Sequence, residues 1–150
     1  MVSSRTLLVV MALAVGGLLA FQGGINAELR RTLGSPVNTA VVSFAVGTVA
    51  LLVVSLLTRQ AWTPLLPLAS APAWIWLGGL CGAFYVAFAT VLVPRIGAAS
   101  TIALSIAGQV LASMLIDALG LVRVPVHPLS ALRVLGAALV VGGAVLVQRF

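Results

Sequence analysis

Five apolar runs, each about as long as a membrane-spanning helix, constrain this chain more than any other feature. The hydrocarbon core of a bilayer is about 30 Å thick, and a helix of about 20 residues crosses it. Five such runs in 150 residues leave room only for short ends and connections. The sequence therefore predicts an all-α membrane protein, a bundle of about five transmembrane helices that forms a single transmembrane domain over residues 1–150. The expected spans cover approximately residues 6–27, 37–58, 73–94, 98–119 and 129–148.

The composition excludes other classes of protein. Hydrophobic residues make up 62% of the chain and charged residues 7%, with a mean hydropathy of +1.26. A soluble enzyme needs a more charged surface, and disorder needs low hydrophobicity with a high net charge. The formal net charge of +6 comes from eight arginines against two acids, and the arginines lie mainly at the ends of apolar runs. Membrane topology and anionic headgroups account for this pattern, so we expect no nucleic-acid partner.

Residues that could carry catalysis or bind a metal are sparse. Cys81 is the one cysteine and lies inside an apolar run, and His127 is the one histidine and lies in a connection. The sequence has no group of His, Cys and carboxylate residues with the spacing of metal ligands. The sequence also offers no nucleophile with a neighbouring base and no pair of acids that could act in catalysis. We therefore expect a protein that is not an enzyme and that has no metal and no cofactor.

The first run has an alternative interpretation as a cleaved signal peptide. Arg5, the apolar stretch 7–21 and the stretch 25–27 follow the order of such a leader. We favour a membrane span, because the run has full spanning length and the four remaining spans include no soluble domain to export.

The arginines are balanced between the two sides of the membrane that the spans define. The bias of Lys and Arg in short loops sets the orientation of a membrane protein. Four arginines on each side give almost no bias, so we expect insertion in both orientations and pairing as an antiparallel, dual-topology dimer. A single misplaced boundary would restore a bias, and the partner would then be an oppositely oriented paralogue. The N-terminal side carries Arg5, Arg59, Arg123 and Arg133, and the opposite side carries Arg30, Arg31, Arg95 and Arg149.

A faint internal repeat is weak evidence for a repeated helical hairpin, and chance similarity is the favoured interpretation. A Gly-Gly-Leu element is followed at nearly the same distance by an arginine and a glycine in both halves of the chain. The matching segments are Gly16-Gly17-Leu18 with Arg31-Thr32-Leu33-Gly34, and Gly78-Gly79-Leu80 with Arg95-Ile96-Gly97.

Polar side chains inside the spans are the best indicators of function, because they are costly at membrane depth unless they face protein or water. Ser and Thr commonly make hydrogen bonds that join helices. Amides bring donors and acceptors that a bare helix pair does not satisfy, which favours a role in lining a substrate path. The predicted substrate-binding residues are Gln22, Asn26, Ser43 and Gln109. Gln109 belongs to a stripe at intervals of four in the fourth span, made of Thr101, Ser105, Gln109, Ser113 and Asp117.

One pair of opposite charges lies at the junction of the last two spans. Asp117 is in the last turn of the fourth span, and Arg133 is in the first turns of the fifth. A short connection separates them, so we predict a structural ion pair that locks the two helices together. The alternative is a role for Asp117 in proton coupling.

Several segments together share the pattern of one known family. They are residues 20–26, 34–36 and 43–44 in the first two spans, residues 76–79, 94–99 and 108–109 with Ser113 and Asp117 in the next two, and residues 133–136 in the last. In these segments nearly the whole chain resembles the YdcZ-type inner-membrane proteins of the drug/metabolite transporter superfamily. The resemblance implies a small bacterial inner-membrane protein of about five spans that works as a dimer of opposed subunits. It implies no particular substrate.

The chain departs from related patterns at two places. Ala118 and Leu119 follow Asp117 where the resemblance leads us to expect a bulkier aromatic or histidine-like residue. Small multidrug-resistance relatives depend on a glutamate in the middle of their first span, and this chain has none there. Proton-coupled export of cations is therefore not carried over to this protein.

These observations predict a small integral membrane transporter. We expect it to move a small polar or amphipathic metabolite by alternating access, as a homodimer or a dimer with a paralogue, in the bacterial inner membrane. Its partners would be a small-molecule substrate and the lipid bilayer. The alternatives are a passive channel for a small ion and a non-transporting accessory subunit of a larger membrane complex.

The balanced arginines give a testable topology. A reporter fused to the C-terminus should show both cytoplasmic and periplasmic populations, because neither side has an excess of positive charge. Two lysines added beside Arg149 should drive that end to the cytoplasm. A wild-type protein found in a single orientation would contradict the homodimer with dual topology.

Overall fold

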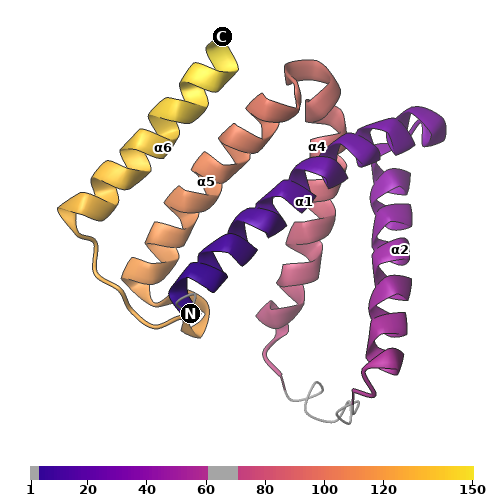
Figure 1. Cartoon of the computed structure of the whole chain (residues 1–150), viewed down its shortest axis with the longest axis horizontal. Coiled ribbons are helices and arrows are strands. Elements are labelled where there is room, and N and C mark those ends of the chain that lie inside the picture. The colour runs from indigo at the N-terminus through magenta and orange to yellow at the C-terminus, as the bar shows by residue number, and fades with distance from the viewer. Residues whose placement is uncertain (1–3, 61–70) are drawn as a thin grey trace. The chain divides into compact units, whose positions relative to one another are not determined.

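The protein is described by a computed structural model that covers residues 4–60 and 71–150, and all regular structure in these residues is helical (Figure 1). Five helices are long and apolar enough to cross a membrane, when the 3₁₀ turn that precedes α4 is counted as part of α4. The prediction of an all-α membrane protein with five spans is confirmed. The elements are α1 (Ser4–Leu33), α2 (Pro36–Leu57), η1 (Ala73–Trp76), α4 (Leu77–Ile96), α5 (Ala98–Leu119), η2 (Leu121–Arg123) and α6 (Ala131–Arg149).

Several helix ends differ from the expected bounds, and two of these differences have identifiable reasons. α1 does not end near Ala27 but continues to Leu33, because good helix formers follow Ala27 and no breaker comes before Gly34. α4 includes Pro94 and ends at Ile96. α6 begins at Ala131, where the Ser130 hydroxyl accepts a hydrogen bond from the backbone N–H of Arg133 at 3.3 Å and caps the helix.

The starts of α2 and α5 share a local geometry. Each follows a glycine with positive φ, +68° at Gly34 and +85° at Gly97, a conformation that glycine adopts at no steric cost. Four residues after each capping residue, a buried threonine returns a hydrogen bond to the carbonyl of that cap. Thr39 donates to Ser35 at 2.9 Å, and Thr101 donates to Gly97 at 2.8 Å. This similarity supports the hypothesis of a repeated hairpin.

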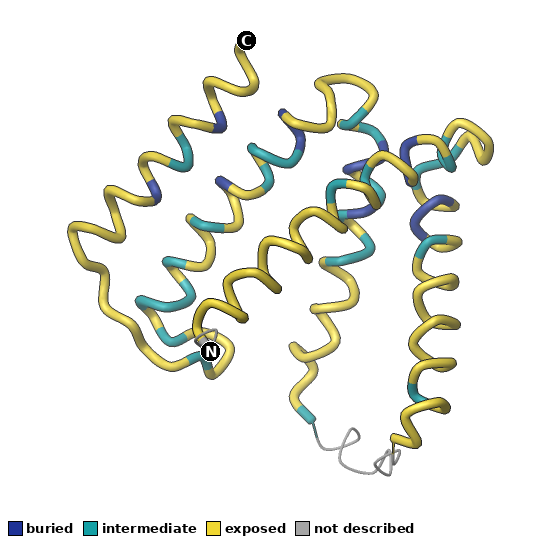
Figure 2. Tube along the Cα trace, viewed as in Figure 1, coloured by how far each residue is buried: buried dark blue, intermediate teal, exposed yellow. Residues whose placement is uncertain are grey.

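The described residues fall into two compact units, Met1–Val91 and Leu92–Phe150, and each is considered by itself. A single transmembrane domain over the whole chain stays a prediction. In the first unit, the buried segments of α1, α2 and α4 gather toward the end at which α1 passes into α2 (Figure 2). The buried residues there are Asn26, Ala27, Thr39, Ala40, Val86, Ala89 and Thr90.

An arginine of α1 compensates for the proline inside α4. Pro94 has no N–H, so the carbonyl of Thr90, four residues earlier, lacks its usual helical donor. The guanidinium Nη1 of Arg30 donates to that carbonyl oxygen at 3.1 Å. The interaction joins residues 60 positions apart in the sequence and satisfies a backbone group that a helix with a proline would otherwise leave unpaired.

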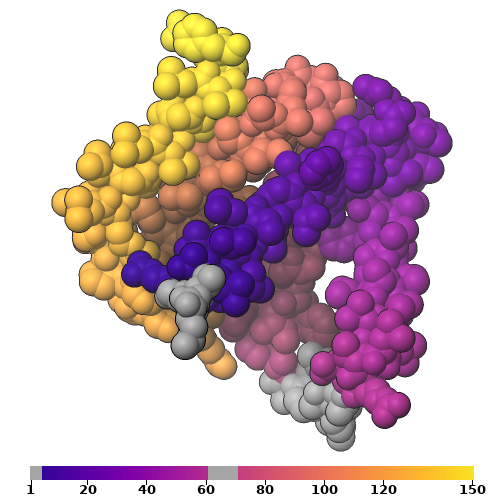
Figure 3. Space-filling view, in the orientation of Figure 1, coloured from indigo at the N-terminus to yellow at the C-terminus, as the bar shows by residue number. Residues whose placement is uncertain are grey.

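In the second unit, α5 and α6 pack against each other as an antiparallel pair. The Ser100 hydroxyl at the start of α5 donates to the carbonyl of Val147 near the end of α6 at 3.4 Å. Small buried residues, among them Ala107 and Ala137, let the two backbones approach closely. Figure 3 shows the atoms of α6 lying against those of α5.

The outward surfaces of the helices are strongly apolar. Large side chains such as Leu57 and Leu132 are 78% and 80% exposed. A water-soluble monomer does not leave so many large apolar side chains uncovered. A bilayer provides the apolar surroundings that these side chains require.

The contact between Arg30 and the carbonyl of Thr90 predicts a specific pattern of stability. Arg30→Leu should lower the free energy of unfolding by about 1–3 kcal/mol, because the carbonyl loses its donor. The same substitution should cost clearly less in a Pro94→Ala background, where the alanine supplies the missing backbone N–H. Equilibrium unfolding in mixed micelles measures all four proteins of this double-mutant cycle.

Arg31→Leu is the matched control, since Arg31 pairs with Glu28 on the surface, with side chains 71% and 69% exposed. It should change the stability by less than about 1 kcal/mol. An equal effect of Arg30→Leu in both backgrounds would contradict the assignment.

Candidate functional site

A groove of about 430 Å³ lies between α5 and α6. Its volume is in the range of small-molecule binding sites, about 300–1,000 Å³. The lining combines an amide, a hydroxyl and two opposite charges with apolar side chains. The lining residues are Ile106, Gln109, Val110, Ser113, Met114, Asp117, Arg133, Gly136 and Ala137.

Helical periodicity and small side chains together create the groove. The lining residues of α5 follow the helical repeat, so they share one face of that helix. On α6, Gly136 and Ala137 follow Arg133 by three and four positions and contribute almost no side-chain volume. A Cβ atom added at Gly136 would have no neighbouring atom within 4 Å. The groove is open there because α6 carries its smallest residues opposite the polar face of α5.

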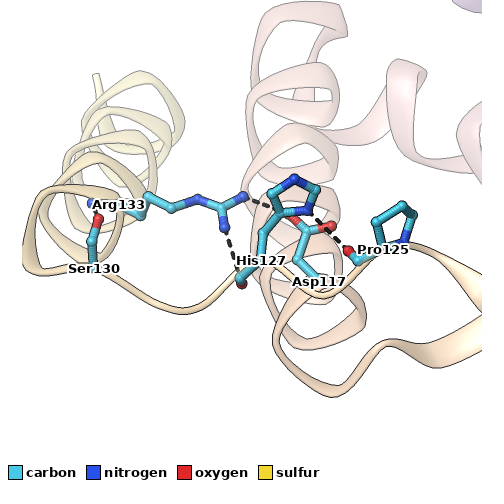
Figure 4. A network of polar contacts seen from close by, with 5 residues as sticks. All are labelled: Asp117, Pro125, His127, Ser130 and Arg133. Atoms are coloured by element: carbon cyan, nitrogen blue, oxygen red, sulfur yellow. Dashed lines mark hydrogen bonds and ion pairs between the residues drawn. The ribbon is translucent and has the colours of Figure 1, made fainter.

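The charged end of the groove contains an ion pair (Figure 4). The Nη2 of Arg133 donates to Oδ2 of Asp117 at 2.5 Å, and its Nη1 donates to the carbonyl oxygen of His127 at 3.3 Å. The Asp117 side chain is 23% exposed and the Arg133 side chain is 40% exposed. The pair is therefore partly shielded and still reachable from the groove.

Each member of this pair lies at the unfavourable end of its helix dipole. Asp117 is in the last turn of α5, where the helix end is negative, and Arg133 is in the first turn of α6, where the helix end is positive. Because the two helices run antiparallel, the end of α5 lies next to the start of α6. The attraction between Asp117 and Arg133 therefore offsets both penalties.

The connection between α5 and α6 folds back on the ion pair. Gly120 ends α5 in the left-handed conformation, and an added Cβ would come within 2.8 Å of the Val126 side chain. The backbone N–H of His127 donates to the carbonyl of Asp117 at 2.9 Å, which satisfies one of the last carbonyls of α5. The His127 Nδ1 lies 2.9 Å from the carbonyl oxygen of Pro125, which only accepts, so this contact requires a proton on Nδ1.

The groove contains one of the four predicted substrate-binding residues. Gln109 is exposed within it, together with the predicted ion pair of Asp117 and Arg133. Gln22, Asn26 and Ser43 belong to the other unit of the chain. Gln22 is exposed, Asn26 is 5% exposed and Ser43 is half-buried. Their role in binding a substrate stays a prediction.

Gly136 and Ala137 shape the site and are not among the residues predicted for it from the sequence. Their signal was present as small residues three and four positions after Arg133, on the same helical face. Among residues 4–60 and 71–150, no group of three or more His, Cys, Asp and Glu residues is arranged to hold a metal ion.

A second groove, of about 330 Å³, lies between α2 and α4 and has a different character. Its lining is apolar and includes Phe44, which would contact a Cβ added at Gly82 at 3.2 Å, and Phe84, whose ring stacks on Phe88. It lacks the amide and the charges of the α5–α6 groove. Acyl chains of the bilayer suit such a surface better than a polar molecule does.

Apolar outer surfaces on five candidate spans, with a polar groove between two of them, define a multi-pass membrane protein. A family model, DMT_YdcZ, described as "Putative inner membrane exporter, YdcZ", matches residues 7–146. The chain therefore belongs to this family of inner-membrane exporters, and the resemblance seen in the sequence is confirmed. The description of the family is that of a membrane exporter and not of an enzyme. Searches of curated proteins and of solved structures gave no match.

The partly shielded ion pair predicts a graded response to substitution. Asp117→Leu should lower the free energy of unfolding by about 1–2 kcal/mol, between the values typical of exposed and of buried pairs, because the Arg133 guanidinium loses its partner. Asp117→Asn should cost less, since the amide oxygen still accepts a hydrogen bond from Arg133. Equilibrium unfolding of both variants checks this order. Two variants as stable as the wild type would show that the pair does not hold α5 and α6 together.

Proposed function

We propose that this protein exports a small polar or amphipathic molecule by alternating access, with the α5–α6 groove as part of the substrate path. The observation that carries the proposal is the polar groove itself. Gln109, Ser113, Asp117 and Arg133 line it on two helices whose other outward surfaces are apolar. Polar groups at membrane depth are retained where they face water, substrate or protein.

The depth of Gln109 supports a role in binding. It is near the middle of α5, which runs from Ala98 to Leu119, and alternating-access sites lie near the bilayer midplane. Asp117 is two turns further along the helix, about 12 Å at 1.5 Å per residue. The groove therefore connects a midplane amide with a charged pair close to one membrane surface.

The balance of arginines supports a dimer of oppositely oriented subunits. In such a pair the α5–α6 groove of each subunit would be closed by its partner. A site at the interface of opposed repeats is typical of transporters built on inverted topology.

Reconstituted protein tests this function. Liposomes containing the purified protein are loaded with a mixture of small cellular metabolites, and the compounds released are identified by mass spectrometry. We expect saturable release of a small subset of compounds, with exchange when the same compounds are added outside. Unsaturable flux of small ions without exchange would favour the channel, and no flux at all would favour the accessory subunit.

Gln109→Leu tests the site assignment within this assay. The change removes the amide at similar bulk and should reduce flux by about tenfold or more, equivalent to about 1.4 kcal/mol of lost interaction. Folding and cross-linking of the dimer should remain unchanged. Full flux through a well-formed Gln109→Leu dimer would overturn the assignment.

Gly136→Leu tests the groove by filling it. The new side chain enters open space and should block flux without loss of stability. Gly142→Leu is the matched control, because Gly142 is on the same helix, also has open space around it and does not line the groove. Equal flux in the two variants would show that substrate does not pass through the α5–α6 groove.

A further inference from the structure

The ion pair of Asp117 and Arg133 has hydrogen-bonding capacity that the fold does not use. An arginine side chain has five N–H donors, and a carboxylate has about four acceptor sites. Among the described residues, the Arg133 guanidinium donates to two acceptors, Asp117 and the His127 carbonyl. Asp117 accepts this hydrogen bond through Oδ2. Both side chains line the groove and both are partly exposed. The pair is therefore equipped to hold additional groups of both charges.

Two opposite charges side by side discriminate between ligands by net charge. A bare cation drawn to Asp117 meets the guanidinium of Arg133, and a bare anion drawn to Arg133 meets the carboxylate of Asp117. Like charges brought together away from bulk water repel strongly. A molecule that carries both charges on neighbouring atoms satisfies both residues at once, because its ammonium pairs with Asp117 and its acidic group pairs with Arg133.

The remainder of the groove limits the rest of the ligand. Ile106, Val110 and Met114 supply an apolar wall, and Gln109 and Ser113 supply uncharged polar groups further along. Neither Gln109 nor Ser113 makes a side-chain hydrogen bond to another described residue. A small apolar substituent fits this lining, whereas a second charge would be left without a partner there.

We propose that the α5–α6 groove binds an amphipathic zwitterion, a small molecule with an ammonium group, an adjacent carboxylate and an apolar substituent. The ammonium binds Asp117, the carboxylate binds Arg133, and the ion pair opens to admit both. This inference rests on the proposed function, since it names the class of substrate for the same site.

Three probes of nearly equal shape and different charge test the proposal. Leucine is a zwitterion, leucinamide is a cation at neutral pH, and N-acetylleucine is an anion. A ligand that binds only the folded protein raises its unfolding temperature in a saturable way. We expect leucine to raise the unfolding temperature of the purified wild-type protein and the other two probes to have no effect. No shift with leucine, or an equal or larger shift with either charged probe, would overturn the proposal.

Substitutions separate binding from a purely structural role. Arg133→Gln should raise the half-saturating concentration of leucine by about tenfold or more and turn the preference toward leucinamide, since Asp117 remains. Asp117→Asn should turn it toward N-acetylleucine. Arg149→Gln, at the far end of the same helix, removes the same charge outside the groove and should leave the preference unchanged. Loss of the leucine effect in both groove variants, with no effect gained by leucinamide or N-acetylleucine, would mean that the pair only stabilises the fold.

The release assay distinguishes this inference from the proposed function. Saturable release that depends on Gln109 and is restricted to compounds with a net charge would support the exporter function and contradict the binding of a zwitterion. Release restricted to zwitterions with apolar substituents would support both.

Discussion

The hydrogen bond from Arg30 to the carbonyl of Thr90 shows the constraint on which the rest of the structure depends. Water is absent from the bilayer core, so every backbone polar group there needs a partner within the protein. Pro94 removes one such partner from α4, and Arg30 restores it from the last turns of α1. A charge that the sequence places at a membrane surface thus becomes part of the contact between two helices. The extension of α1 beyond Ala27 is what brings it there.

The same constraint distinguishes polar groups that the fold satisfies from polar groups that it leaves without a partner. Thr39, Thr90 and Thr101 direct their hydroxyls to carbonyls of nearby residues in the chain. They are satisfied without any ligand. Gln109 and Ser113 have no such bond among the described residues and face the α5–α6 groove. The fold therefore satisfies these threonines by itself and leaves the side chains of Gln109 and Ser113 without a hydrogen-bond partner among the described residues.

Much of the architecture was predictable, because length and hydrophobicity determine a membrane span directly. The proximity of Asp117 and Arg133 also followed from the short connection between their helices, and the structure places them in contact. The partner of Arg30 did not follow, since Thr90 is 60 residues away and pattern alone does not show which helices meet. The groove could not be predicted from the sequence either, because it depends on the face that Gly136 and Ala137 turn toward α5.

Thiol labelling along α5 tests most directly the central claim that the groove is a water-filled part of the transport path. In a Cys81→Ala background, which removes the single native cysteine, Gln109→Cys is compared with Leu111→Cys. Leu111 is nearly as deep on the same helix and does not line the groove. A charged, membrane-impermeant thiol reagent should modify the cysteine at position 109 much faster than the one at position 111, because the reactive thiolate forms only where water reaches it. Equal rates of modification at the two positions would contradict the account.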